Sequence, residues 1–145
     1  MENQRIARGT CLCGTVTISA IDMSKSLYAC HCTMCTKWGG GPWQAVKCVD
    51  VAFTGIEHIK IYESSAWAER GFCLRCGNHL FYKLKRNGRY YISIGLFDEC
   101  EEVKLDKQFF IDQKPVYYCF ANETEELTAA DIYTKYASPP KLLYN

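Results

Sequence analysis

The sequence predicts an all-β fold of many short strands with few helices. Polar and apolar residues alternate with a period of two over short segments, glycines separate several of these segments, and few stretches favour a helix. Period-two alternation is typical of a strand with one buried face. The expected strands are 15–20, 27–29, 43–48, 51–54, 59–62, 80–84 and 90–94. Asn87-Gly88, between the last two, is a strong hairpin signal.

The remaining segments give a weaker pattern. Residues 33–38 are predicted to form one helical turn that ends at the run Gly39-Gly40-Gly41-Pro42. Residues 125–136 favour a short helix capped by Thr124. Further strands are expected at 109–111 and 116–118, and a surface tail at Pro139-Pro140-Lys141. No repeat, low-complexity tract or linker divides the sequence, so we predict one domain over residues 1–145.

The composition is that of an ordinary globular protein. Of 145 residues, 48% are hydrophobic, and 17 basic against 16 acidic side chains leave a net charge of +1. This balance argues against a nucleic-acid partner, and there is no run of about 20 apolar residues to span a membrane. The first residues lead into no apolar signal segment, so we expect the ten cysteines in a reducing cytoplasm.

Seven of the ten cysteines fall into three tight clusters: Cys11 and Cys13; Cys30, Cys32 and Cys35; and Cys73 and Cys76. Neighbours two or three positions apart rarely satisfy disulfide geometry, whereas Cys-x-x-Cys loops supply thiolates to tetrahedral Zn²⁺. We interpret the clusters as metal ligands rather than disulfides or buried free thiols. Iron of the rubredoxin kind is a minor alternative, because four thiolates from two such loops also suit it.

The ligand count predicts two metal sites of different kinds. Cys11, Cys13, Cys73 and Cys76 would complete a closed structural zinc site that joins segments 60 positions apart. Cys30, Cys32 and Cys35 would hold a second zinc. Its fourth position is either open to a substrate or closed by a protein ligand, for which the candidates are His31, Cys48, His58 and Cys100. His31 lies between two ligands, so its side chain is expected to point away from the metal.

The second site is suited to sulfur chemistry. Three thiolates leave a Zn²⁺ site with one net negative charge, so the metal would be a poorer Lewis acid than one bound by three imidazoles. Such a site favours a soft fourth ligand, a substrate thiol bound as thiolate. We therefore assign Cys30, Cys32 and Cys35 as catalytic residues as well as metal ligands.

Five runs together resemble the glutathione-dependent formaldehyde-activating enzyme family: G-T-C-L-C-G-T-V at 9–16, C-H-C-T-M-C-T-K at 30–37, Y-E-S-S at 62–65, R-G-F-C-L-R-C-G-N-H-L at 70–80 and G-L-F-D at 95–98. The resemblance implies a tent-like β fold with the two zinc sites assigned above. It also implies a carbon–sulfur lyase-type reaction that joins glutathione and formaldehyde as S-hydroxymethylglutathione. Ser64-Ser65-Ala66 and Gly95-Leu96-Phe97-Asp98 depart from the usual family motifs, and residues beyond 100 match none.

Substrate contacts follow from this implied chemistry. A thiol tripeptide carries carboxylates, so Lys37 and Arg70 are candidate cationic contacts, with solvated surface charge as the alternative. Asp98 is a candidate for orienting a proton or a ligand, although it could equally cap a turn. Trp38, Trp43 and Trp67 either line a pocket or pack in the core, and Cys48, Cys100 and Cys119 are expected to be buried.

The expected partners are small molecules, namely a thiol such as glutathione as co-substrate and an aldehyde. The rival function is a non-catalytic, zinc-stabilised interaction module. A sealed second site would favour that rival.

Overall fold

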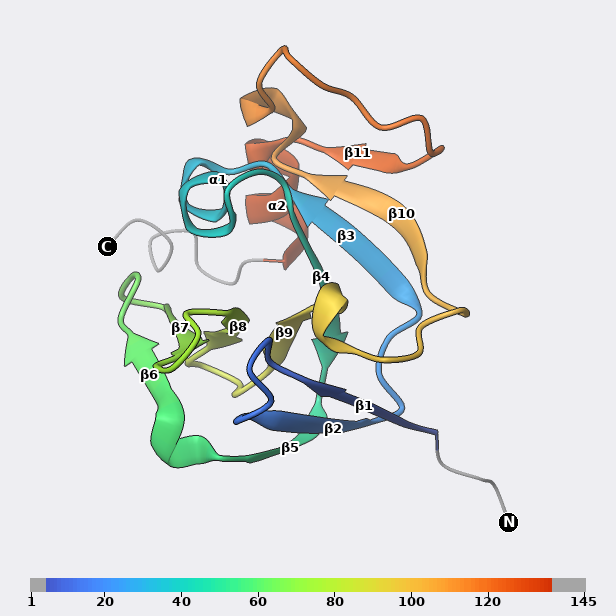
Figure 1. The fold of residues 1–145 in the computed structure, drawn as a ribbon. Helices are drawn as coiled ribbons and strands as arrows, with labels where there is room; N and C mark the ends of the chain where they lie inside the picture. The colour runs from blue at the N-terminus through green and yellow to red at the C-terminus, as the bar shows by residue number, and fades with distance from the viewer. Residues whose placement is uncertain (1–4, 137–145) are drawn as a thin grey trace.

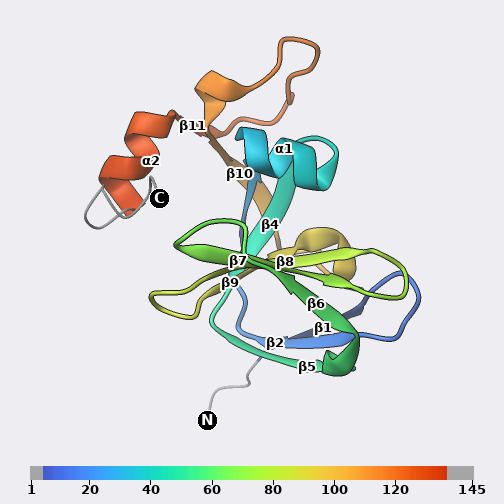
Figure 2. The same cartoon turned by 90° about the vertical axis from the view of Figure 1, so that its left-hand side faces the viewer.

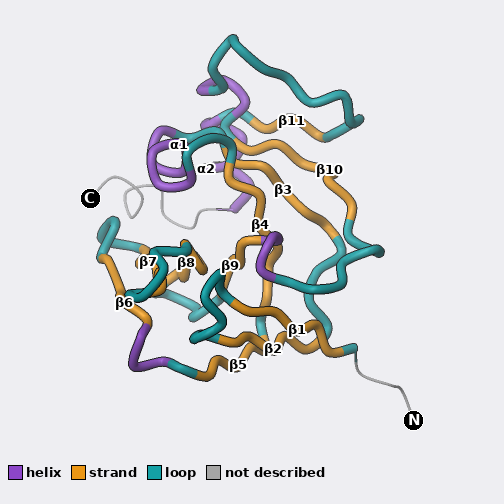
Figure 3. The backbone as a smooth tube through the Cα atoms, viewed as in Figure 1, coloured by secondary structure: helices purple, strands orange, loops and turns teal. Residues whose placement is uncertain are grey.

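The computed structural model describes residues 5–136, and strands dominate this part of the chain (Figure 3). The strands form two sheets, one of three strands and one of eight, and only two α-helices accompany them in the described residues. The predicted all-β class with few short helices is confirmed. Neither helix in residues 5–136 combines the length and apolar character that crossing a bilayer requires.

Figure 1 shows the arrangement of these elements. The strands are β1 (Ile6–Thr10), β2 (Thr17–Ile21), β3 (Ser26–Cys30), β4 (Trp43–Cys48), β5 (Asp50–Thr54), β6 (Ile59–Tyr62), β7 (Ala68–Cys73), β8 (His79–Leu84), β9 (Tyr90–Ser93), β10 (Lys104–Phe109) and β11 (Glu125–Leu127). The helices are α1 (Thr33–Gly39) and α2 (Ala129–Tyr136), with 3-10 turns η1 (Ile56–His58), η2 (Ile94–Leu96) and η3 (Ile111–Gln113).

The small antiparallel sheet, in the order β1-β2-β5, packs its apolar face against the large sheet. In β2, buried Ile18 and Ala20 alternate with half-buried neighbours, as period-two patterning requires. In Figure 2 this sheet lies below β6–β9, while α1 lies on the other side of them. Ile18 meets Leu80 and Ile92 of the large sheet in one apolar core.

The large sheet has the order β11-β10-β3-β4-β9-β8-β7-β6, and its middle strands have buried residues on both faces. Strand β4 shows this most clearly. Val46 and Cys48 belong to the core shared with the small sheet, whereas Trp43 and Ala45 belong to a second core on the opposite face. Because successive side chains of a strand point to opposite faces, one strand supplies both cores.

The C-terminal part differs from the sequence prediction. Phe110 adopts a left-handed conformation (φ 58°) and ends β10, so the strand predicted at 109–111 is wrong beyond Phe109. Residues 116–118 form no strand. Residues 125–127 are not helical, because they pair in parallel with β10. Helix α2 starts only after Thr128, whose hydroxyl accepts from the Asp131 N–H at 3.1 Å. The tail at 139–141 lies outside the described residues.

Gly9 in β1 lies very close to the backbone around η2. It forms an antiparallel bridge with Phe97, the residue that directly follows η2. A Cβ at Gly9 would lie 2.0 Å from the Leu96 carbonyl oxygen, which is backbone and cannot rotate away. We expect Gly9→Ala to lower the free energy of unfolding by roughly 1–3 kcal/mol, the usual range for overpacking. Denaturant unfolding at fixed zinc concentration measures this loss.

Gly95→Ala is the matched control, because a Cβ there would have nothing within 4 Å. If both variants unfold at the same denaturant concentration, the close approach of β1 to η2 is not a constraint on the fold.

Candidate metal centres

The first cluster is built from two short turns that face each other. Each turn ends at a glycine with a positive φ, 82° at Gly14 and 75° at Gly77, a conformation in which glycine has no side chain to clash. The N–H of Gly14 donates to the Cys11 carbonyl at 3.0 Å, and that of Gly77 to the Cys73 carbonyl at 2.8 Å. These bonds close the Cys-Leu-Cys and Cys-Leu-Arg-Cys turns, so each turn directs its sulfurs to one side.

The sulfurs of Cys11, Cys13, Cys73 and Cys76 all lie within 4.8 Å of one another. The sulfurs of Cys11 and Cys13 are 3.6 Å apart, and those of Cys13 and Cys73 are 3.8 Å apart. A tetrahedron with zinc–sulfur bonds of about 2.3 Å has sulfur–sulfur edges of about 3.8 Å. The spacing of this cluster therefore fits four thiolates around one Zn²⁺.

Hydrogen bonds reach several sulfurs of this cluster. The backbone N–H of Val16 donates to the Cys11 sulfur at 3.3 Å, and that of Arg75 to the Cys73 sulfur at 3.4 Å. Hydrogen bonds with the side chain and backbone of Thr15, whose hydroxyl lies 3.2 Å from the Cys13 sulfur, are the main causes that lower the pKa of Cys13 to about 6. Such donors stabilise negative charge on sulfur, which metal binding requires.

The second cluster gathers where β3 passes into α1. Cys30 ends β3, Cys32 is the N-cap of α1, and Cys35 lies in the first turn, with all three sulfurs within 4.8 Å of one another. The Cys32 sulfur accepts the N–H of Cys35 at 3.3 Å, and Gly40 ends the helix in a left-handed conformation. The N-cap at Cys32 and the C-cap at Gly40 thus limit α1 to two turns, and the first of these places Cys35 beside Cys30.

The three thiols of this second cluster are not equivalent. Hydrogen bonds from Cys30 and Cys35 lower the pKa of Cys32 to about 3, whereas sharing a proton with Cys32 keeps the pKa of Cys30 well above its ordinary value. Cys32 is also half-buried, while Cys30 and Cys35 are buried. Cys32 is therefore the most accessible and the most readily ionised sulfur of the three.

Arg70 lies against this cluster rather than at the surface. Its side chain extends from β7, is only 3% exposed, and brings Nη1 and Nη2 to 3.7 and 3.6 Å from the Cys35 sulfur. The guanidinium lies between two aromatic rings, 5.0 Å from the ring centroid of Trp38 and 4.9 Å from that of Tyr82. Of the three predicted substrate contacts, the structure brings this one to the cysteines.

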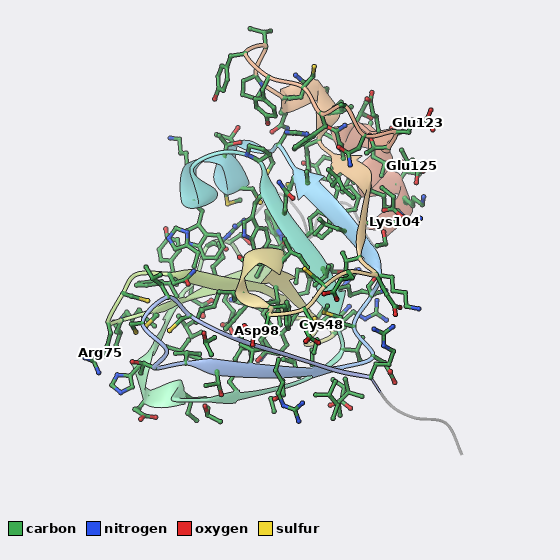
Figure 4. All side chains as sticks on the ribbon, turned by 45° about the vertical axis from the view of Figure 1, so that its right-hand side comes forward. Cys48, Arg75, Asp98, Lys104, Glu123 and Glu125 are labelled. Atoms are coloured by element: carbon green, nitrogen blue, oxygen red, sulfur yellow. The ribbon has the colours of Figure 1, made fainter. Side chains whose placement is uncertain are left out.

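The other two predicted contacts lie elsewhere. Lys37 is exposed on α1. It follows the buried Cys35 by two positions, so its side chain points about 200° away from that cysteine around the helix axis. Asp98 is exposed beside β1, and its N–H donates to the Arg8 carbonyl at 2.9 Å (Figure 4). Asp98 lines a hollow of about 620 Å³ with residues of β1 and the loop after η2, and none of Cys30, Cys32 and Cys35 lines it.

No fourth protein ligand joins the second cluster within the described residues. Cys48 lies in the core on the opposite face of the sheet. The ring nitrogens of His31, a buried side chain, instead contact the Tyr118 hydroxyl and the Gln108 Oε1, the latter at 2.8 Å. His58 and Cys100 are likewise not within 4.8 Å of the three sulfurs. His31 thus connects the metal-binding turn to β10 and the segment that follows it.

The remaining tryptophans and cysteines fit the predictions in part. Trp43 packs in the second core, whereas Trp38 stacks on His79 with ring centroids 4.2 Å apart. Cys100 is half-buried and Cys119 is exposed, so the expectation that both are buried is wrong. Both lie in connections rather than strands, where no neighbouring strand covers them.

Sequence reasoning also missed a row of tyrosines behind the second cluster. Tyr82 and Tyr91 are direct cross-strand partners, and Tyr28 meets Tyr91 edge-on with centroids 5.9 Å apart. Burial keeps the pKa of Tyr28 well above its ordinary value. The only sequence signal is their alternation with residues of the opposite core, such as Phe81 and Ile92.

Known proteins are similar to this chain in sequence and in fold. The chain is 36% identical over 127 residues to an uncharacterised lyase of Schizosaccharomyces pombe, covering 86% of this chain and 92% of the relative. It is 30% identical over 86 residues to a Halomonas elongata protein provisionally named a glutathione-dependent formaldehyde-activating enzyme, covering 52% of this chain and 55% of that protein.

A crystal structure of a Rhodobacter sphaeroides protein is similar in fold, with a TM-score of 0.53 and 23% identity over 63% of this chain and 87% of that one. The family model described as glutathione-dependent formaldehyde-activating enzyme matches residues 6–113, which include both cysteine clusters and Arg70. The chain therefore belongs to the glutathione-dependent formaldehyde-activating enzyme family.

Proposed function

We propose that the chain is a zinc-dependent carbon–sulfur lyase that acts on the adduct of a small thiol and an aldehyde, such as S-hydroxymethylglutathione. The single observation that carries this proposal is the gathering of Cys30, Cys32 and Cys35 without a fourth protein ligand among the described residues. Three ligands leave a coordination position for substrate, whereas four close a structural site. Membership in the family supports the lyase class and the glutathione-related substrate.

The two clusters would hold zinc for different purposes. Cys11, Cys13, Cys73 and Cys76 would bind a structural ion, because their sulfur spacing of 3.6 and 3.8 Å matches a closed tetrahedron. Cys30, Cys32 and Cys35 would bind the second ion. Zinc bound there would supply a means of keeping a thiol deprotonated at neutral pH, since an ordinary thiol has a pKa near 8.5.

The protein's own residues would orient the substrate and exclude water. Cys30 and Cys35 are buried, so a substrate approaches from the side of half-buried Cys32. Trp38 and Tyr82 cover the guanidinium of Arg70 and keep water from the inner side of the cluster. In the cleavage direction, the hydroxyl proton passes to solvent, the carbonyl bond of the aldehyde forms, and the carbon–sulfur bond breaks with its electron pair going to sulfur. The reverse direction forms that bond.

Removal of Cys32 tests the function. We expect wild-type protein to contain two zinc ions and Cys32→Ser to retain one, because one thiolate of the three-sulfur site is lost. Glutathione binding by calorimetry and glutathione-dependent formaldehyde turnover should both fall at least about tenfold in the variant, consistent with loss of a metal ligand.

Cys119→Ser is the matched control, since Cys119 is exposed and belongs to neither cluster. Two zinc ions with no turnover of any thiol–aldehyde adduct would point to the binding-module alternative. Wild-type glutathione binding after loss of the second zinc would contradict the proposed site.

The separate roles of the two ions predict different effects on stability. The first cluster joins Cys13 to Cys73, which are 60 positions apart, whereas the second spans only Cys30 to Cys35. Loop-closure entropy grows with the logarithm of loop length, so Cys73→Ser should cost at least about 2 kcal/mol more unfolding free energy than Cys32→Ser. Denaturant unfolding of both zinc-loaded variants measures the difference, and equal losses would contradict a structural role confined to the first cluster.

A further inference from the structure

Arg70 is a buried cation without a carboxylate partner in the described residues. The ion pairs found within residues 5–136 involve other side chains, and the Nε of Arg70 has no hydrogen-bond partner there. A guanidinium cannot lose its proton in a protein, and burying an unpaired charge is costly. Some anion must therefore compensate it.

The sulfur of Cys35 is the group that the guanidinium approaches. Two of its nitrogens, Nη1 and Nη2, lie 3.7 and 3.6 Å from that sulfur, as a planar fork of donors would around one anion. The rings of Trp38 and Tyr82 cover both sides at about 5 Å. Aromatic faces attract a cation but carry no net charge, so they do not neutralise it.

We propose that Arg70 is a built-in counter-charge for the second metal site, and acts as a positioning residue rather than as a substrate contact. Three thiolates around Zn²⁺ leave one negative charge, and the guanidinium cancels it. This proposal depends on the proposed zinc at Cys30, Cys32 and Cys35 but not on the reaction carried out there.

This neutralisation has a chemical consequence. A substrate thiolate would meet a site of zero net charge instead of a negative one, so its approach would not be opposed by like charge. Hydrogen bonds to the Cys35 sulfur would also withdraw electron density from that ligand, and thereby make the metal a better Lewis acid than three unassisted thiolates allow.

The first cluster provides an internal comparison. Its four cysteines include exposed Cys13 and half-buried Cys76, so water can screen the two negative charges of a four-thiolate zinc site. Arg75 lies within that cluster's second turn, yet its side chain is exposed (Figure 4). Each cluster has two buried cysteines, but the buried arginine accompanies the cluster that has no exposed cysteine.

Arg70→Met removes the charge while keeping an unbranched apolar side chain of similar reach. We expect the affinity for the second Zn²⁺, measured by competition with a chromophoric chelator, to fall about 10–100-fold, the usual effect of losing a hydrogen-bond partner of a ligand. The first Zn²⁺ should stay bound. Arg70→Lys, which keeps the charge but not the fork of donors, should recover most of the affinity.

Arg89→Met is the matched control, because Arg89 is exposed at the turn between β8 and β9. A second measurement uses the Co²⁺-loaded proteins and their absorption spectra. Binding of glutathione, an anionic ligand once deprotonated, should weaken in Arg70→Met more than binding of imidazole, a neutral ligand. A merely structural role would weaken both equally.

Wild-type affinity for the second Zn²⁺ in Arg70→Met would overturn the proposal. If Arg70→Met does not fold, Arg70→Lys decides the matter. Recovery to within about tenfold of wild type supports a counter-charge. A folded lysine variant that holds only the first Zn²⁺ overturns it. Failure of the lyase assignment would give a different result. The wild type would bind two Zn²⁺ ions tightly, Arg70→Met would still lose affinity for the second Zn²⁺, and no turnover would be seen.

Discussion

The structure depends on one strand, β7, whose residues support both cysteine clusters. Cys73 ends this strand and faces the core that the two sheets share, while Arg70 belongs to the opposite face and reaches the Cys35 sulfur. The register shift between Gly71 and Phe72, opposite β8, lies between these two positions. The extra residue of this shift is Leu80 on β8, so β7 keeps its regular alternation. Arg70 and Cys73 are three positions apart and therefore lie on opposite faces, which lets a short strand present a metal ligand at its end and a buried cation within it.

The two clusters differ in the length of chain that they join. The first joins the N-terminal turn to the end of β7 across 60 positions, and the Leu12 N–H donates to the Asn78 Oδ1 at 2.8 Å to link the same two turns directly. The second is local in sequence and depends on its surroundings, because β3, α1 and β7 must meet for its sulfurs to approach Arg70. The first cluster therefore constrains the fold, and the fold in turn constrains the second cluster.

Local patterns predicted most of the architecture. Period-two alternation identified most strands of both sheets between 17 and 93, and cysteine spacing identified both clusters, because these signals are carried within a few residues. It missed β1 and β7, where an Arg-Gly pair interrupts the apolar alternation. The same reasoning named Arg70, but as a substrate contact or a solvated surface charge, since sequence gives no measure of burial at a charged position. It failed beyond Cys100, where β10 pairs in parallel with both β3 and β11. Partners so distant in sequence leave no local signal.

His31 explains why that distant region affects the second cluster. It lies between two proposed ligands, and its ring contacts Gln108 of β10 and the Tyr118 hydroxyl. Gln108 in turn donates from Nε2 to the Thr124 hydroxyl at 2.8 Å. Tyr118 and Thr124 lie beyond residue 113, where the match to the family model ends. The turn at His31 is thus held in place by Gln108, inside the family match, and by Tyr118, beyond it, and replacing either residue would leave a ring nitrogen of the buried His31 unpaired.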